Sequence, residues 1–555
     1  MTATLVEQAP PEVPPPSARG RWRGVGSALL TFLAFALVWI ALTIPNDLTR
    51  LTPVSLLRIP LEGLLIVGLL LVLKPGTRQA VGALVGFVLG LLVIVKVLDT
   101  GFYVAFNRPF NPAVDFAYFP SAVDLLRLSV GRRDAIVALA VAGVLVAVLL
   151  LVLPLALLRI VRVVDEHRVG VLRTVIALAV AWVAFGAVAL LTGSSSIASA
   201  STATMAAFHA GQVKAGLQDK EAFAQAAADD PVRSVPPDSL LAGLRGKDVI
   251  VAFVESYGRV ALEDPALAPG VTAALATGDQ RLAAAGFSAR SGFLTSSTFG
   301  GLSWLAHSTL QSGLLIDNQQ RYDHLLATDR ATLSSLFKRA GWRTAAFVSA
   351  NERAWPEGRT FYGYDSIYDD TNMGYLGLHF GFATMPDQFI WSVLQRRELG
   401  VAGHTPLMAE VDLVSSHTPW AQLPQMVDWK DVGTGAVFSV MAVQGLDAEQ
   451  LWRDPVKIKA NYGTSIEYSL NALTSFVQHY GSDNLVLVVL GDHQPSTMVS
   501  GQESSHDVPI SVIAHDPAVM ARLADWGWTP SLKPDPSAPV WPMESFRDRL
   551  LAAFS

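Results

Sequence analysis

Cysteine is absent from this 555-residue chain, and charged residues are scarce in it. Without cysteine there are no disulfides, thiolate metal ligands or cysteine nucleophiles, so an exported domain would depend on its hydrophobic core alone. Charged residues make up 16% of the chain, the net charge is -6 and the pI is near 6.0. That balance lacks the basic surface of a nucleic-acid-binding protein. No nucleic-acid partner is therefore expected.

Apolar residues are abundant instead, and they are concentrated before residue 193. The chain is 51% hydrophobic with a mean hydropathy of +0.38. Residues 1–24 are proline-rich and end in arginines, which predicts a disordered cytoplasmic tail. A five-helix transmembrane domain is expected over residues 25–192, because its apolar segments are near the roughly 20 residues needed to cross a bilayer. These segments are residues 25–44, 54–73, 80–98, 135–158 and 171–191. The second is the weakest, since Arg58, Pro60 and Glu62 stand at its start.

Basic residues in the short loops predict the orientation in a cell membrane. With the N-terminus in the cytoplasm, most of them fall on the cytoplasmic side, where such loops collect lysine and arginine. They are Arg19, Arg21, Arg23, Lys74, Arg78, Arg159, Arg162 and Arg168. Arg132 and Arg133 fall on the outer side and oppose this assignment. Five crossings then place the chain after residue 193 outside the cytoplasm.

The outer loop at residues 99–133 is rich in phenylalanine and tyrosine. One interpretation is an interfacial aromatic belt. The other is a surface that presents a lipid substrate to the outer domain. Beyond the last apolar segment, residues 193–240 change to serine, alanine, threonine and then charged residues and proline. They predict a linker with a helix over about residues 205–228.

The outer domain, residues 241–555, alternates short apolar runs with helical patterns. The apolar runs are residues 248–254, 344–348, 407–414 and 485–490, with 508–514 as a further candidate. Helical patterns at residues 331–340 and 462–477 lie between them. This alternation predicts an α/β fold with a mainly parallel sheet covered on both faces. Ligands of such folds bind beyond the carboxyl ends of the strands.

Polar residues follow several of these runs and are expected to meet at that edge. They are Glu255, His417 and the pair Asp492-His493. Ser303 follows two glycines at the start of an amphipathic run, where a helix N-terminus would stabilise a phosphate. The alternative for Ser303 is a plain helix N-cap. Together, Glu255, Ser303, Asp492 and His493 predict a site for one divalent cation, which would activate the serine. Taken singly, a carboxylate after a strand often caps the next helix, and Asp-His is a common turn pair.

Four motifs in order then carry a family resemblance. They are Glu255-Ser after a strand, Ser303-x-x-x-His307-x-x-Leu310-x-Ser312-Gly313, Ser416-His417-x-Pro419 and Gly491-Asp492-His493. The chain resembles the alkaline phosphatase and sulfatase superfamily. With membrane spans ahead of the motifs, it resembles the branch of lipoteichoic acid synthases and of phosphoethanolamine and phosphoglycerol transferases. The resemblance implies a sulfatase-like domain with one metal ion, Mn²⁺ first and Zn²⁺ or Mg²⁺ as alternatives. It also implies a Ser303 nucleophile, with Thr298 as the fallback because that branch often uses threonine.

The departures from the sulfatase motif narrow the chemistry. Leu305 and His307 stand where sulfatases need proline or alanine and then arginine to oxidise the nucleophile. An unmodified serine is therefore expected, which suits phosphoryl transfer better than sulfate-ester hydrolysis. His307 lies one helical turn after Ser303 and could hold the phosphate in place of that arginine. The alternative is a helix histidine satisfied by a neighbour.

The resemblance further implies a set of substrate contacts. His417 matches a substrate-facing histidine, and His506 stands where many relatives place another active-site histidine. Trp355 lies in a region resembling the glycerol-phosphate contacts of lipoteichoic acid synthases, with Arg353 and Arg359 as alternative arginines. The other histidines are expected to be structural, including His324, His379, His404, His479 and His515.

The predicted function is transfer of a phospho-head group, phosphoglycerol or similar, from a membrane phospholipid to an extracytoplasmic glycan, polymer or lipid. The reaction would pass through a phospho-serine intermediate. One alternative is a membrane-bound phosphodiesterase or sulfatase-like hydrolase, in which water is the acceptor. The other is a non-catalytic binding module of the cell envelope.

Overall fold

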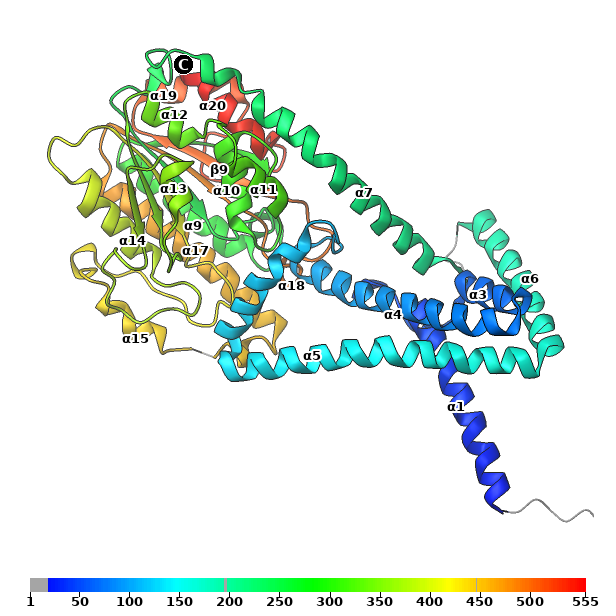
Figure 1. Cartoon of the computed structure of the whole chain (residues 1–555). Helices are drawn as coiled ribbons and strands as arrows, with labels where there is room; N and C mark the ends of the chain where they lie inside the picture. The colour runs from blue at the N-terminus through cyan, green and yellow to red at the C-terminus, as the bar shows by residue number, and fades with distance from the viewer. Residues whose placement is uncertain (1–17, 194–196, 446) are drawn as a thin grey trace, which may run out of the picture. The chain divides into compact units, whose positions relative to one another are not determined.

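The computed structural model describes residues 18–193, 197–445 and 447–555, and the chain divides into two compact units (Figure 1). The first unit comprises Met1–Thr100 and Ser129–Gly211, and the second comprises Gly101–Leu128 and Gln212–Ser555. Residues 1–17 of the predicted disordered tail lie outside the described residues. Helix α1 (Ala18–Thr43) begins within the last residues of that tail.

Four helices in the described part of the chain are long and apolar enough to cross a membrane. These candidate spans are Val25–Thr43 in α1, Pro75–Phe106 (α4), Gly131–Glu166 in α5 (Phe119–Glu166) and Arg168–Thr192 (α6). The predicted span at residues 54–73 is instead broken into α2 (Pro53–Leu57), β1 (Ile59–Pro60) and α3 (Leu61–Val72). The break falls at Arg58 and Pro60, and α3 rises only about 18 Å against a hydrocarbon core of about 30 Å. Five crossings are not confirmed, so the side of the membrane on which the chain continues stays a prediction.

Several of the arginines predicted to be cytoplasmic are bound to neighbouring helices within the first unit. Arg78 pairs with Asp165, and Arg159 Nε donates to Thr31 Oγ1 at 2.9 Å. Arg168 donates to the Leu71 carbonyl at 2.9 Å. These contacts join the beginnings of α1, α4 and α6 to the ends of α3 and α5. The arginines therefore gather at one end of the helices of this unit.

The long helix α7 (Ser201–Ala228) covers the predicted helical part of the linker, and its start is held by buried polar groups of α4. Lys96 Nζ donates to Thr202 Oγ1 at 2.8 Å, and His209 Nε2 lies 3.0 Å from Asp99 Oδ2. The four side chains are buried, so each polar group needs such a partner.

The second unit is built on an eight-stranded sheet of order β10-β4-β9-β8-β3-β7-β5-β6. All pairings are parallel except those of β9, which runs antiparallel to β4 and β8. The strands are β3 (Asp248–Val254), β4 (Ser288–Thr295), β5 (Arg343–Val348), β6 (Ser366–Asp369), β7 (Leu407–Leu413), β8 (Leu485–Gly491), β9 (Asp507–Ala514) and β10 (Val540–Pro542). The predicted mainly parallel sheet is therefore confirmed.

Helices cover both faces of this sheet, and the alternation of β3 shows how (Figure 1). Ile250, Ala252 and Val254 pack in one core with α9 (Ala268–Ala284), α14 (Asp387–Leu394) and α17 (Pro455–Tyr480). Val249, Val251 and Phe253 pack in the other with α10 (Ser303–Ser312), α12 (Leu333–Arg339) and α20 (Phe546–Phe554). A strand buried on both faces reads as a continuous apolar run, which is why β3 and β8 were predictable.

Shorter helices occupy the connections of the second unit. They are α8 (Val260–Glu263), α11 (Gln319–Leu326), α13 (Pro356–Thr360), α15 (Ser439–Ala442), α16 (Ala448–Leu451), α18 (Thr497–Ser500) and α19 (Pro517–Ala521). The sequence did not predict β4, β6 or β10. Strand β4 has the mixed sequence Ser-Ala-Arg-Ser-Gly-Phe-Leu-Thr, and the other two have only four and three residues.

Candidate metal centre and nucleophile

Ser303 is the first residue of α10, and its side chain is not a helix cap. Leu302 occupies the N-cap position in the left-handed conformation, with φ +67°, and no side chain caps the helix. Gly300 and Gly301, with φ +70° and +155°, form the turn that leads into it. The Ser303 hydroxyl oxygen lies 3.0 Å from Glu255 Oε2 and 3.1 Å from His493 Nε2. The N-cap alternative is therefore wrong, and the hydroxyl faces the strand ends.

The strand-end residues come together because β3 and β8 are parallel neighbours. Val254 pairs with Gly491 in the register, so Glu255 and Asp492 follow matched positions. One ligand atom from each of Glu255, Asp492 and His493 lies within 4.8 Å of the others. Their exposures are 9%, 1% and 1%. The four residues predicted to form the metal site thus lie together, with Glu255, Asp492 and His493 buried and Ser303 half-buried.

Backbone groups at the strand ends orient the two carboxylates. Asp492 Oδ1 accepts hydrogen bonds from the backbone N–H groups of Ser256 and His493, each at 2.7 Å. The Ser256 hydroxyl donates to Glu255 Oε1 at 2.7 Å. Ser256 has φ +56°, a sparsely populated conformation for a residue with a side chain. Such backbone strain is held where a site needs a particular orientation.

The two carboxyl groups have opposite pKa shifts. Burial raises the pKa of Glu255, but the nearby charges of His493 and His417 outweigh it and lower the value to about 2. Burial, and after it the charge of Glu255, raises the pKa of Asp492 to about 6. Glu255 is therefore the ionised member of the pair at neutral pH, and Asp492 gains its proton first on acidification.

The cluster fits a divalent cation. His493 Nδ1 lies 2.8 Å from the Gln494 carbonyl, which only accepts, so Nδ1 carries the proton and Nε2 presents a lone pair. That lone pair faces Glu255 Oε1 at 3.4 Å and Asp492 Oδ2 at 3.5 Å. Among the described residues, Asp492 Oδ2 has no hydrogen-bond partner. Buried acceptors that face one another repel, and a cation between them relieves that cost.

His307 lies one turn after Ser303, as predicted, and its ring stacks on Phe253 with centroids 3.8 Å apart. Its Nδ1 lies 3.4 Å from Glu410 Oε1 and 3.6 Å from Asp412 Oδ1. Burial alone would lower the pKa of His307, but the charges of Asp412 and Glu410 outweigh it and raise the value to about 9. His307 Nδ1 therefore faces two carboxyl oxygens. The role of His307 toward phosphate stays a prediction.

His417 follows β7, and His506 directly precedes β9. His417 stacks on Phe382 with centroids 4.0 Å apart, and its charge helps to lower the pKa of Glu255. His506 packs against Phe299, with centroids 5.2 Å apart, and burial lowers its pKa. Because β9 is antiparallel, the residue before it lies at the same sheet edge as the residues after β3 and β8. Their substrate roles stay predictions.

For the remaining predicted residues the structure gives local contacts and burial. Trp355 packs against Tyr362 and Tyr364, with centroids 5.2 and 6.0 Å apart, and Arg359 donates to the Asp365 carbonyl at 2.9 Å. Arg353 is exposed in the loop after β5. The fallback Thr298 is buried, and its hydroxyl has no hydrogen-bond partner in the part of the chain that the structure describes. Within the described residues, the hydrogen bonds to Glu255 and His493 are made by the hydroxyl of Ser303 and not by that of Thr298.

Sequence reasoning missed Glu410, Asp412 and Ser256. The two acids were counted within the apolar run at residues 407–414. A signal was present, because carboxylates at alternate positions of a buried strand point to the same face and are costly there unless paired.

The aromatic segment from residue 101 to 119 belongs to the second unit and lies against the nucleophile loop. The Thr497 hydroxyl donates to the Val104 carbonyl at 2.7 Å, and Tyr118 OH accepts from the Gln319 backbone N–H at 2.9 Å. The Tyr118 ring lies 6.4 Å from that of Trp304, the residue after Ser303. The segment therefore packs as part of the second unit, and its role in presenting a lipid stays a prediction.

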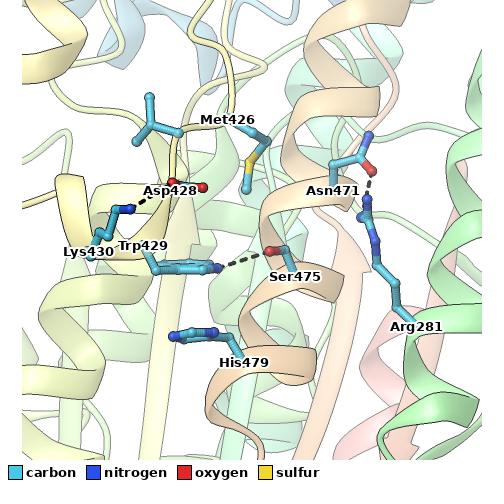
Figure 2. Close-up of a pocket in the computed structure, with 9 residues that line it drawn as sticks. Arg281, Met426, Asp428, Trp429, Lys430, Asn471, Ser475 and His479 are labelled. Carbon is cyan, nitrogen blue, oxygen red and sulfur yellow. Dashed lines mark hydrogen bonds and ion pairs between the residues drawn. The ribbon is translucent and has the colours of Figure 1, made fainter.

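A separate pocket of about 560 Å³ lies at the opposite edge of the sheet (Figure 2). Ser475 and His479 line it near the end of α17, which leads into the start of β8. Figure 2 shows Trp429 Nε1 donating to Ser475 Oγ, at 2.9 Å, above the His479 ring. His479 stacks on Trp429 with centroids 6.2 Å apart, in keeping with the structural role predicted for it.

Comparisons with known proteins find similar solved structures but no matching protein family. No protein-family model matches the chain, and no curated protein matches it. The lipoteichoic acid synthase LtaP of Listeria monocytogenes is 15% identical, with 58% of this chain and 77% of that chain covered and a TM-score of 0.36. The periplasmic domain of the Escherichia coli protein EptC, in complex with Zn, is 14% identical, with 50% and 76% covered and a TM-score of 0.34. The Streptococcus pyogenes phosphoglycerol transferase GacH is 12% identical, with 60% and 91% covered and a TM-score of 0.34. The similar structures carry the names of the branch that the motifs resemble.

Proposed function

We propose that this protein transfers a phosphate-bearing head group from a membrane lipid to an acceptor hydroxyl, with Ser303 as the nucleophile. One observation supports the proposal above all. The Ser303 hydroxyl lies at the N-terminus of α10 and within 3.1 Å of both Glu255 and His493. A nucleophile at a helix N-terminus meets phosphate where backbone N–H groups favour negative charge.

The first half of the reaction forms a covalent intermediate. Ser303 Oγ, which has lost its proton to solvent beforehand, attacks the phosphorus of the lipid phosphodiester, and the bond from phosphorus to the diacylglycerol oxygen breaks. The departing oxygen takes a proton from a nearby acid, for which His417 and His506 are the candidates. A cation held by Glu255, Ser303, Asp492 and His493 would lower the pKa of the serine hydroxyl and neutralise charge on the phosphoryl group.

The second half returns the enzyme to its starting state. The hydroxyl of a glycan, polymer or lipid acceptor attacks the same phosphorus, the bond to Ser303 Oγ breaks, and the acceptor proton passes to the base left by the first step. His307, whose Nε2 has no partner among the described residues, would donate to a phosphoryl oxygen. Trp355 with Arg353 or Arg359 would contact the head group.

The membrane helices and the aromatic segment support a lipid donor. Four helices of the described chain are long and apolar enough to cross a bilayer. The segment at residues 101–119 carries Phe102, Phe106, Phe110, Phe116 and Phe119, whose rings contact one another in sequence. Phe116 is 56% exposed. Exposed aromatic rings are suited to the headgroup region of a membrane.

The test is a mass measurement on the full-length protein in detergent. The protein is incubated with head-group-labelled phosphatidylglycerol or phosphatidylethanolamine, quenched in acid and measured intact and as peptides. A labelled adduct on the peptide containing Ser303, absent from Ser303→Ala, is expected with one of the lipids. Turnover without an adduct on Ser303, or an adduct on Thr298, would contradict the assignment. Release of the labelled head group to water, with no transfer to any added acceptor, would make the protein a hydrolase.

A further inference from the structure

A second group of metal-ligand side chains lies beside the first. Glu410 and Asp412 alternate on β7, so both point to the face covered by α10, from which His307 projects. One ligand atom from each of the three lies within 4.8 Å of the others. His307 and Ser303 are one turn apart on α10, which separates the two groups by about 6 Å along the helix.

The distances within this group are those of ligands that share an ion. His307 Nδ1 lies 3.4 Å from Glu410 Oε1 and 3.6 Å from Asp412 Oδ1. A charge-assisted hydrogen bond would draw nitrogen and oxygen to about 2.7–2.9 Å. Ligands about 2.0–2.2 Å from a tetrahedral zinc ion have donor atoms about 3.3–3.6 Å apart. Both distances in the group fall in the second range.

The unpartnered atoms point to the same conclusion. Within the described residues, Asp412 Oδ1 is buried and has no hydrogen-bond partner. Glu410 Oε1 is left for the group because Oε2 accepts from Tyr364 OH at 2.7 Å and from the Gln311 amide. The Gln311 amide is oriented in turn, since its Oε1 accepts from the Ser334 backbone N–H at 2.9 Å. A carboxylate that binds a metal through one oxygen commonly accepts hydrogen bonds at the other, and these hydrogen bonds orient it.

The charge balance of the sheet edge leaves room for a second cation. Glu255, Asp492, Glu410 and Asp412 are four carboxyl groups that influence one another's charge, and all but the half-buried Asp412 are buried. In the described part of the chain, their ion pairs are with His307 and His493 alone. Burial, with the charges of Glu410 and Asp492, raises the pKa of Asp412 to about 7 against the opposing charge of His307. One divalent cation at the first group would leave the second pair of carboxylates with His307 alone to balance their charge.

We infer that His307, Glu410 and Asp412 bind a second divalent cation, with Zn²⁺ the best match, through His307 Nδ1 and one oxygen of each carboxylate. The His307 Nε2–H then remains free to donate to a substrate oxygen. The inference concerns cation binding alone and stands whether or not the proposed transfer reaction is correct.

The test counts metal ions on the full-length protein in detergent. Metal-free protein is titrated with Zn²⁺ against a competing chelator, and bound metal is then measured by elemental analysis after desalting. Wild type is expected to hold two ions, Asp412→Asn one and Asp492→Asn one. The matched control is Asp387→Asn, a buried carboxyl outside both groups, which should hold two.

The spectrum of Co²⁺ bound to Asp492→Asn identifies the remaining site. Intense visible bands of a tetrahedral ion are expected there, and they should disappear in Asp492→Asn combined with His307→Gln. A wild-type count of one ion, or two ions retained by Asp412→Asn, would overturn the inference. If Asp412→Asn does not fold, His307→Gln replaces it with the same expected count of one. A wild-type count of one would mean that a proton on His307 joins the two carboxylates instead.

Discussion

Gly300 and Gln494 are joined by a hydrogen bond from the Gly300 backbone N–H to the Gln494 carbonyl, at 2.9 Å. The same carbonyl lies 2.8 Å from His493 Nδ1. One oxygen therefore orients the metal-ligand histidine and the turn that leads into Ser303. A second bond, from the Ser296 hydroxyl to the Asp492 carbonyl, joins the same two loops. The loop that leads to Ser303 is thus positioned by the backbone of the loop that carries Asp492 and His493.

Gly300→Ala should disrupt this arrangement. Gly300 has φ +70°, and an added Cβ would overlap the Ala105 carbonyl oxygen. Backbone strain of this kind costs about 1–3 kcal/mol before the overlap is counted. We expect a lower melting temperature in detergent and a loss of most activity. Gly374→Ala, at φ +78° with open space around the Cβ, is the control and should keep its activity. Equal activity losses in the two variants would refute the positioning role.

Ser303→Ala should abolish turnover, and Thr298→Ala should not. Removing a covalent nucleophile typically lowers kcat by about 10³-fold or more. In the described part of the chain the Thr298 hydroxyl makes no hydrogen bond to the metal-site residues, so its replacement should leave the rate within about tenfold. Rates are measured by transfer of labelled head group to an acceptor. The reverse ranking of the two variants would move the nucleophile to Thr298.

Removal of divalent metal should inactivate the protein, with a defined pH dependence of rebinding. Protonation of Asp492, whose pKa burial and Glu255 raise to about 6, competes with the cation below that pH. The apparent affinity should therefore fall by about tenfold per pH unit from pH 6 downward, since one proton must be displaced. The check is chelator treatment, followed by titration with Mn²⁺ or Zn²⁺ at pH 5 to 8. An affinity independent of pH across that range would count against Asp492 as a ligand.

Asp387 should make stability depend on pH. Burial raises its pKa from 3.8 to about 6, against the hydrogen bonds from Ser469 and Ser415. Because the folded-state pKa is raised, the protonated group stabilises the fold below about pH 4, and that contribution is lost as the pH rises through about 6. A shift of this size corresponds to about 3 kcal/mol at most. Melting curves of wild type and Asp387→Asn should show a smaller change between pH 4 and 7 for the variant. Parallel curves would disprove the shift.

Thr497→Val should test whether the aromatic segment serves lipid binding. The substitution removes the hydrogen bond to the Val104 carbonyl at 2.7 Å and keeps the size of the side chain. We expect KM for a long-chain phospholipid to rise several-fold, with kcat on a short-chain soluble donor little changed. Thr464→Val, on an exposed helix position, is the control. Equal effects on both donors would mean that the segment supports the site without contacting lipid.

The residues brought together at the sheet edge could be anticipated because parallel strands carry their C-terminal residues to one place. Glu255, Asp492 and His493 follow apolar runs that are buried on both faces, which are the easiest strands to recognise. The position of Ser303 at the start of a helix could be predicted from the two glycines ahead of it. The contacts of Ser303 could not be predicted in this way, because the contact to Glu255 spans 48 residues and depends on the order of the strands.

The features that sequence reasoning missed share a physical cause. Glu410 and Asp412 lie inside a strand whose other residues are apolar, so they were counted as part of an apolar strand and not as candidate site residues. The antiparallel direction of β9 cannot be predicted from its own sequence, because it depends on the pairing with β4 and β8. The membership of residues 101–128 in the second unit likewise depends on packing, with Tyr118 in a core with Leu305, Ile316 and Leu325.

That membership gives the chain an interleaved order, in which residues of the second unit stand both before and after membrane-span candidates. Residues 129–192 separate Tyr118 from the rest of its core, and Phe223 of α7 completes the same core. A single proteolytic cut after the last span would therefore leave Tyr118 with the membrane helices and expose the apolar side chains it covers. One cleavage at that point would therefore divide the second unit between two fragments, because its residues lie on both sides of the cut.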